Sequence, residues 1–77
     1  MTTSQIPERI EFNPKILVGK AIIKGTRISV EFLLELLASG WSHQTILDNY
    51  PQLQEEDIFA ALAYARLRIQ EEHVIPL

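Results

Sequence analysis

The sequence predicts a mainly α fold, with three helices in a helix-turn-helix arrangement behind a short N-terminal β ribbon. Apolar residues recur at helical spacing in three segments after residue 29. Gly40 and Pro51 interrupt that pattern at the two places where turns are needed. Before residue 29, charged and apolar residues alternate around Asn13-Pro14, which is typical of half-buried strands joined by a turn. A single domain of residues 9–72 is therefore expected.

The ribbon is expected to start at residues 9–12, where the alternation is clearest. Residues 15–23 are rich in Ile, Val and Lys, with Gly19 and Gly25 as breakpoints, and predict one or two further short strands. Residues 1–8 are expected to be disordered, because they begin with a small, polar segment. Residues 73–77 form an apolar C-terminal tail whose docking place the sequence does not indicate.

The first helix is expected to follow Ser29, whose hydroxyl can cap the first turn, and to end at Gly40. Its apolar arc is wider than the stripe that one core needs. We expect its core face to hold Val30, Leu33, Leu34 and Leu37, with Phe32 and Leu36 to the side and free for a partner.

The second helix is expected over residues 42–49, capped by Ser42 and stopped before Pro51. The third is expected over residues 55–70, with Glu55, Glu56 and Asp57 complementing the positive end of its dipole. Its predicted core face comprises Ile58, Ala61, Leu62, Ala65 and Ile69. A second, weaker apolar strip comprises Ala60, Ala63, Tyr64 and Leu67.

The composition favours a small cytoplasmic protein that associates with itself or with a partner. A 77-residue chain buries only about 60% of its unfolded surface, so a monomer is marginally stable. There is no cysteine to form a disulfide, and no apolar run approaches the roughly 20 residues of a membrane span. Because 47% of the residues are hydrophobic, surplus apolar surface predicts a homodimer or an obligate partner, and no membrane.

Charge is divided unevenly along the chain. Residues 1–28 carry five cations and two carboxylates, or +3, whereas residues 29–77 carry two cations and eight carboxylates, or −6. The basic residues on or beside the ribbon are the candidates for nucleic-acid binding: Lys15, Lys20, Lys24 and Arg27. The alternative for the lysines is that they protect a strand edge from aggregation. For Arg27 we expect a structural role, in which its guanidinium binds carbonyls or a carboxylate of the fold.

The acidic opening of the third helix argues against its use as a DNA-reading helix, because three carboxylates repel phosphate. The same charges suit an electropositive protein partner. The predicted partner-binding residues combine this cluster with the spare apolar positions: Phe32, Leu36, Glu55, Glu56, Asp57, Tyr64 and Leu67.

No enzyme constellation is visible in the sequence. Cysteine is absent, and His43 and His73 lie thirty residues apart, so neither a nucleophile-base pair nor a metal quartet is indicated. Glu31 and Glu35 share a helix face but are better explained as a solvated polar face. We therefore expect no catalytic residue, no metal and no cofactor.

The order of several short motifs over residues 9–66 resembles the domain of unknown function 433 family. These motifs are Asn13-Pro14, Gly19-Lys20, Ile23, Gly25-Thr26-Arg27-Ile28, Val30, Gly40, Ser42, Ile46-Leu47, Tyr50-Pro51, Leu53, Ile58, Ala60-Ala61-Leu62 and Tyr64. The resemblance implies a prokaryotic protein with a homeodomain-like helical bundle behind a short β element, often regarded as an antitoxin-like partner of a PIN-like ribonuclease. Asn13, Ala21 and Gln54 stand where the family commonly has Asp, Pro and Ser or Thr, which affects local turns and caps.

Three functions are compatible with the sequence. The first is a non-enzymatic, dimeric antitoxin-like protein that restrains a PIN-like ribonuclease toxin, with its own operator DNA as a further candidate ligand through the ribbon. The second is a homodimeric transcriptional regulator that binds DNA without a toxin. The third is a structural adaptor that uses the spare apolar faces of the first and last helices.

Overall fold

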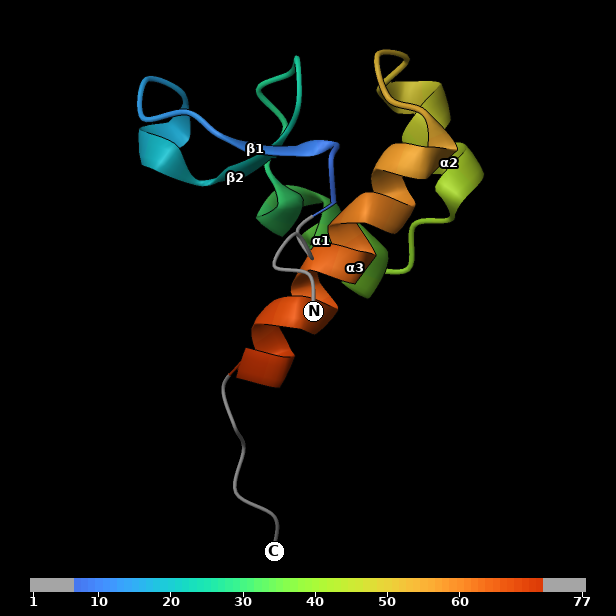
Figure 1. The fold of residues 1–77 in the computed structure, drawn as a ribbon. Helices are drawn as coiled ribbons and strands as arrows, with labels where there is room; N and C mark the ends of the chain where they lie inside the picture. Colours follow the sequence, from blue (N-terminus) through green and yellow to red (C-terminus); the bar gives the residue numbers. More distant parts are fainter. Residues whose placement is uncertain (1–6, 72–77) are drawn as a thin grey trace, which may run out of the picture.

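The computed structural model describes residues 7–71 and confirms a mainly α fold with an N-terminal hairpin (Figure 1). In chain order the elements are β1 (Ile10–Phe12), a single turn η1 (Leu17–Gly19), β2 (Ala21–Ile23), α1 (Val30–Ala38), α2 (His43–Asn49) and α3 (Glu55–Glu71). The hairpin crosses above α1, while α2 packs beside the start of α3 (Figure 1). The expectations for residues 1–6 and for the tail 73–77 lie outside the described residues.

The hairpin is shorter than the sequence pattern predicts. β1 and β2 pair antiparallel, with Ile10 opposite Ile23 and Phe12 opposite Ala21, so that only residues 21–23 of the expected 15–23 form a strand. The connection instead turns through Leu17 and Val18, whose φ angles of +51° and +56° are left-handed. This conformation costs about 1–2 kcal/mol per residue for L-amino acids. The residues before Ala21 therefore form the turn that closes the hairpin, although their sequence favours a strand.

The helix ends follow the predicted capping residues closely. The hydroxyl of Ser29 accepts the N–H of Phe32 at 2.9 Å, and that of Ser42 accepts the N–H of Thr45 at 3.0 Å. Gly40, with φ of +96°, follows the last turn of α1; its N–H donates to the carbonyl of Leu37, and the N–H of Trp41 donates to that of Leu36. This is the Schellman arrangement, so α1 itself ends at Ala38, two residues before the predicted glycine.

The core lies between the hairpin, α1, α2 and the first half of α3. Its largest fully buried side chains are Ile22, Ile23, Leu33, Ile46 and Ile58. On α1 the buried residues are Val30, Leu33 and Leu36, so the expectation that Leu36 lies beside the core is wrong.

The predicted core face of α3 is wrong at two positions. Leu62 and Ile69 are 40% and 59% exposed, while Ala60 is buried instead. The second half of α3 projects past the other elements (Figure 1), and Ile69 therefore has no core to pack on. The helical spacing of apolar residues continues to the end of α3, but the elements on which these residues could pack end earlier.

Asp57 connects the hairpin to the start of α3. One of its carboxylate oxygens accepts from Arg9 Nη1 at 2.8 Å, and the other accepts the N–H of Gln54 at 2.8 Å. Arg9 Nη2 also lies 3.4 Å from Gln54 Oε1. Asp57 is 5% exposed, so these bonds satisfy a carboxylate that is shielded from water. The bond to Gln54 is one half of a capping box, in which an acidic side chain at the third position of the helix accepts the N–H of the residue before the helix.

The replacement Asp57→Ala is expected to lower the free energy of unfolding by about 2 kcal/mol, because it uncaps Gln54 and removes the buried partner of Arg9. Urea denaturation followed by circular dichroism measures the change. Glu56→Ala is the matched control: it removes an exposed carboxylate from the same turn and should change stability by less than about 0.5 kcal/mol. Equal losses in the two variants would contradict the structural role of Asp57.

A second ion pair joins the hairpin to α1, from Lys20 Nζ to Glu31 Oε1 at 2.8 Å. Both side chains are exposed. The hydrogen bond and the charge of Lys20 lower the pKa of Glu31 below its ordinary value. A lowered folded-state pKa adds stability above the unfolded pKa, and that contribution is lost as pH falls through the folded value.

We expect Lys20→Met to be less stable than the native chain at pH 7 and to converge with it as pH falls through the lowered pKa of Glu31. Thermal unfolding midpoints between pH 7 and pH 3 measure the difference. Lys15→Met removes an exposed lysine that has no ion pair among the described residues, and its offset should not vary in this window. A pH-independent offset for Lys20→Met would refute the coupling.

Candidate partner-binding surface

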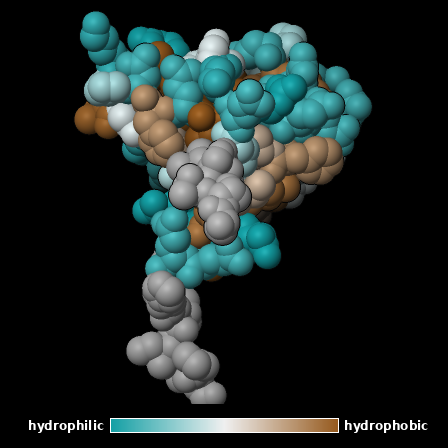
Figure 2. Space-filling view, in the orientation of Figure 1, coloured by the Kyte–Doolittle hydropathy of each residue, from teal (hydrophilic) through white to brown (hydrophobic). Residues whose placement is uncertain are grey.

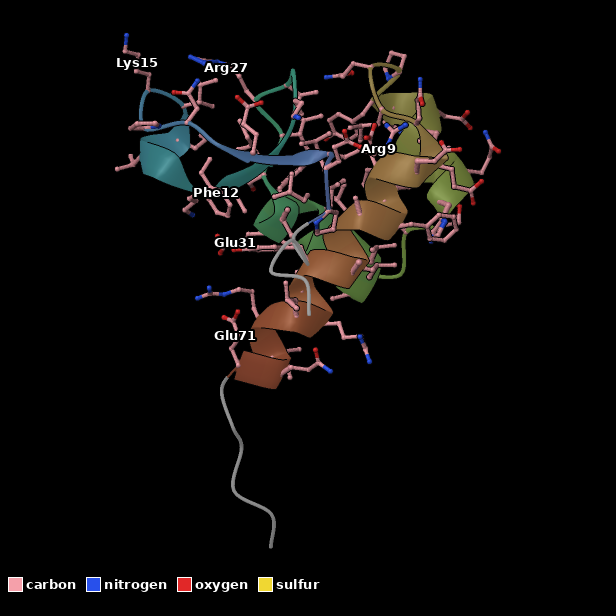
Figure 3. The ribbon with its side chains drawn as sticks, in the orientation of Figure 1. Arg9, Phe12, Lys15, Arg27, Glu31 and Glu71 are labelled. Carbon is pink, nitrogen blue, oxygen red and sulfur yellow. The ribbon has the colours of Figure 1, made fainter. Side chains whose placement is uncertain are left out.

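The structure divides the four predicted nucleic-acid-binding residues. Lys15 lies in the turn after β1, while Lys24 and Arg27 lie in the connection between β2 and α1, and all three are exposed. Figure 3 places Lys15 and Arg27 along the same edge of the hairpin. Lys20, by contrast, is held by Glu31 of α1.

The positive charge of the hairpin is smaller than its sequence suggests. Of the five cations in residues 7–28, Arg9 pairs with Asp57 and Lys20 with Glu31. Three cations then remain against two carboxylates, Glu8 and Glu11, which leaves +1 rather than +3. Glu11 also lies close to these cations. Its Oε1 atom accepts the N–H of Gly25, the residue that follows Lys24, at 3.3 Å. The hairpin therefore offers little net attraction for phosphate.

The structural arginine of this fold is Arg9, not Arg27. Within residues 7–71 the guanidinium of Arg27 makes no hydrogen bond or ion pair, whereas that of Arg9 binds Asp57 and Gln54. The expectation that Arg27 binds a carboxylate of the fold is therefore wrong within this part of the chain. The sequence shows both arginines beside strand signals and does not reveal which one faces α3.

The outer face of α3 is the most distinctive exposed surface of the helical part. Its residues recur at helical spacing on the side opposite Asp57 and Ala61, and all are exposed: Glu55, Glu56, Phe59, Leu62, Ala63 and Arg66. Phe59 is 53% exposed and Leu62 is 40% exposed. Two large apolar side chains thus reach solvent directly beside two carboxylates.

His43 of α2 holds one side of this surface in place. Its ring meets that of Phe59 edge to face, with 5.6 Å between the ring centroids. Its Nδ1 atom lies 3.3 Å from Glu55 Oε2. An exposed aromatic ring that is already packed on one side loses less conformational freedom when a partner binds it. Glu56 has no ion pair among the described residues and remains the less constrained of the two carboxylates.

The remaining predicted partner-binding residues have internal contacts. Asp57 is buried beneath Arg9, and Leu36 belongs to the core. Phe32 packs edge to face on Tyr50, with ring centroids 5.6 Å apart. Tyr64 packs similarly on Phe12 at 5.9 Å, and Leu67 is half-buried.

Of the predicted set, Glu55 and Glu56 therefore lie on the outer face, while Phe59, Leu62 and His43 are additions from the structure. Phe59 belongs to neither of the two apolar strips that the sequence predicts on α3. Its position outside both strips is the sequence signal that it faces solvent. The sequence pattern places Leu62 on the core face, and it gives His43 no role in a site.

Figure 2 shows how hydrophobic residues reach the surface among hydrophilic ones. Brown atoms appear at the left edge, where Figure 1 places the end of the hairpin. Leu17 and Val18 of this turn are 43% and 93% exposed. Exposed apolar surface is therefore not confined to α3.

Two other features were sought in the described part of the chain, a group of metal ligands and a membrane-spanning helix. Residues 7–71 contain no group of three or more His, Cys, Asp or Glu residues placed to hold a metal ion. Within the same range, no helix has the length and apolar character needed to cross a membrane.

Comparisons with known proteins agree with the fold. The family model described as protein of unknown function (DUF433) matches residues 10–65. The crystal structure of a DUF433 member protein from Anabaena variabilis ATCC 29413 superposes with a TM-score of 0.76 at 33% sequence identity. The match covers 82% of this chain and 62% of that one, so this chain spans less than two thirds of its relative's length. No curated protein matches the sequence. The family model and the solved relative together show that this chain belongs to the DUF433 family.

Proposed function

We propose that this protein is a non-enzymatic, antitoxin-like protein of the prokaryotic cytoplasm that binds and restrains a PIN-like ribonuclease. The observation that carries the proposal is the outer face of α3, where Phe59 and Leu62 are exposed beside Glu55 and Glu56. The class of partner comes from the family resemblance described above. The surface supplies the chemistry that such a partner requires.

The outer face combines an anchor with a steering charge. Large apolar and aromatic side chains commonly supply most of the binding energy at the centre of an interface, and Phe59 and Leu62 are of this kind. Carboxylates at the edge accelerate association with a positively charged partner. A ribonuclease binds a polyanion, so its substrate cleft is expected to be electropositive. Glu55 and Glu56 would meet that cleft in place of RNA phosphates.

The geometry favours a protein partner over DNA. In a helix-turn-helix protein the third helix normally presents its N-terminal residues to the bases. Here those residues include Glu55 and Glu56, with Arg66 the only cation on the outer face. The hairpin adds a net charge of only +1 once its ion pairs are counted. The alternative, a homodimeric DNA-binding regulator without a toxin, therefore lacks a strongly basic surface among the described residues.

The first experiment is purification of the full chain from its native cells at moderate salt, followed by native mass spectrometry. A stoichiometric ribonuclease-like protein is the expected result. Recovery of this chain alone, together with salt-sensitive binding to its own operator, would instead favour the regulator.

With the captured partner, Phe59→Ala is expected to weaken binding by at least about 30-fold, which corresponds to a loss of about 2 kcal/mol for an interface anchor. Surface plasmon resonance measures the affinity and the rates. Val18→Ala is the control, because Val18 is 93% exposed but lies in the hairpin turn. Similar affinities for the native chain and Phe59→Ala would exclude the outer face as the anchor.

The paired replacement of Glu55 and Glu56 by lysine should slow association at low salt by at least about tenfold, with a smaller effect at high salt. Glu35→Lys is the matched control, because Glu35 is exposed on α1, away from the outer face. Equal association rates for all three proteins at low salt would remove the electrostatic part of the proposal.

A further inference from the structure

A second surface lies where α3 projects beyond the rest of the fold. The last turns of α3, the start of α1 and the start of β2 enclose an open groove of about 400 Å³. Figure 3 shows Glu31 and Glu71 extending on the same side of the molecule, below the hairpin. The groove is lined by Lys20, Ala21, Val30, Glu31, Leu34, Tyr64, Ala65, Arg68 and Ile69.

The floor of the groove is apolar, and its borders are charged in balanced pairs. Ile69 is 59% exposed although it continues the apolar spacing of α3. One border carries the Lys20–Glu31 pair at 2.8 Å, and the other carries the Arg68–Glu71 pair at 3.2 Å. Two cations and two carboxylates therefore give the borders no net charge, in a chain whose formal charge is −3.

We propose that a second copy of this chain occupies the groove, with the projecting ends of the two α3 helices packed antiparallel about a two-fold axis. A two-fold interface must be complementary to itself, because the same surface is used by both copies. A surface with equal numbers of both charges meets that condition. With no net charge, the borders offer neither a polyanion nor a strongly basic protein a net electrostatic attraction.

The exposed end of α3 also supports a dimer through this groove. The last turns of α3 project past the hairpin and α2 (Figure 1), and Ile69 remains 59% exposed although the start of α1 lines the same groove. In proteins most helical stability comes from tertiary packing. In the proposed dimer, each projecting end covers the apolar floor of the other copy. Ile69 would then be buried without any change in the fold of either chain.

The groove and the outer face centre on different lengths of α3, and the dimer does not depend on the proposed function. Ile69 follows Leu62 by seven positions on nearly the same side of the helix, about 10 Å further along its axis. Arg68 of the groove and Phe59 of the outer face are nine positions apart, which places them half a turn from each other around the helix. Dimerisation therefore leaves Phe59 accessible on both copies. Loss of one interface is expected to spare the other.

Sedimentation equilibrium of the full chain between about 1 and 200 µM tests the proposal, with Ile69→Glu as the principal variant. The native chain is expected to form a dimer in this range. Ile69→Glu should weaken the dimer by at least about 100-fold, because it places an unpaired carboxylate on the apolar floor. Phe59→Glu introduces the same charge on the outer face of the same helix and should leave the dimer unchanged.

Circular dichroism distinguishes a lost interface from a lost fold, since Ile69 is exposed in the single chain and its replacement should preserve the helical signal. Leu34→Glu, from α1, supplies an independent variant of the same groove. A native chain that remains monomeric at 200 µM would overturn the proposal and leave the groove to residues 72–77 or to another protein. A dimer that survives Ile69→Glu with unchanged affinity would place the interface elsewhere and overturn it equally.

Discussion

The carboxylate of Asp57 connects parts of the chain that are 48 residues apart, and the position of α3 depends on this connection. One oxygen binds Arg9 at the start of the hairpin, and the other closes the open end of α3 at Gln54. Because both bonds are made by a buried group, neither is readily exchanged for a bond to water. They orient α3 so that Ile58 and Ala61 enter the core while Phe59 faces solvent. The outer face of α3 is thus a consequence of where its first turn is held.

The helices could be predicted from the sequence because their ends are determined locally. Ser29 and Ser42 cap nearby amides, and Gly40 adopts the left-handed conformation that follows a helix. The hairpin connection could not, because Leu17 and Val18 adopt a conformation that their side chains disfavour. The core face of α3 was also mispredicted in part, since periodicity shows which residues share a side but not where the neighbouring elements stop.

The candidate site was harder to predict because formal charge does not show which charges are already paired. Summing the first 28 residues indicates a basic ribbon, but Arg9 and Lys20 bind carboxylates that lie 48 and 11 positions further along the chain. Those two contacts remove two of the three excess positive charges. The same pairing withdraws Asp57 from the acidic cluster that the sequence places at the start of α3. Glu55 and Glu56 stay in the proposed site because both are exposed and, among the described residues, no lysine or arginine pairs with them. Phe59 lies between them and Leu62 on the same face of α3.

The length of α3 explains how a domain of this size can present two separate surfaces. At about 1.5 Å per residue, its 17 residues extend roughly 25 Å, which is more than the short hairpin and α1 can cover. The first half is fixed by Asp57 and exposes one side, whereas the last turns also expose Ile69, which continues the apolar spacing of the core-facing side. The proposed dimer would cover that second half and leave the first half free. Two outer faces would then be carried by one rigid assembly, and a partner with two matching sites would bind more tightly than either face alone allows. Such a gain depends on the groove at Ile69, while the affinity of each single face depends on Phe59.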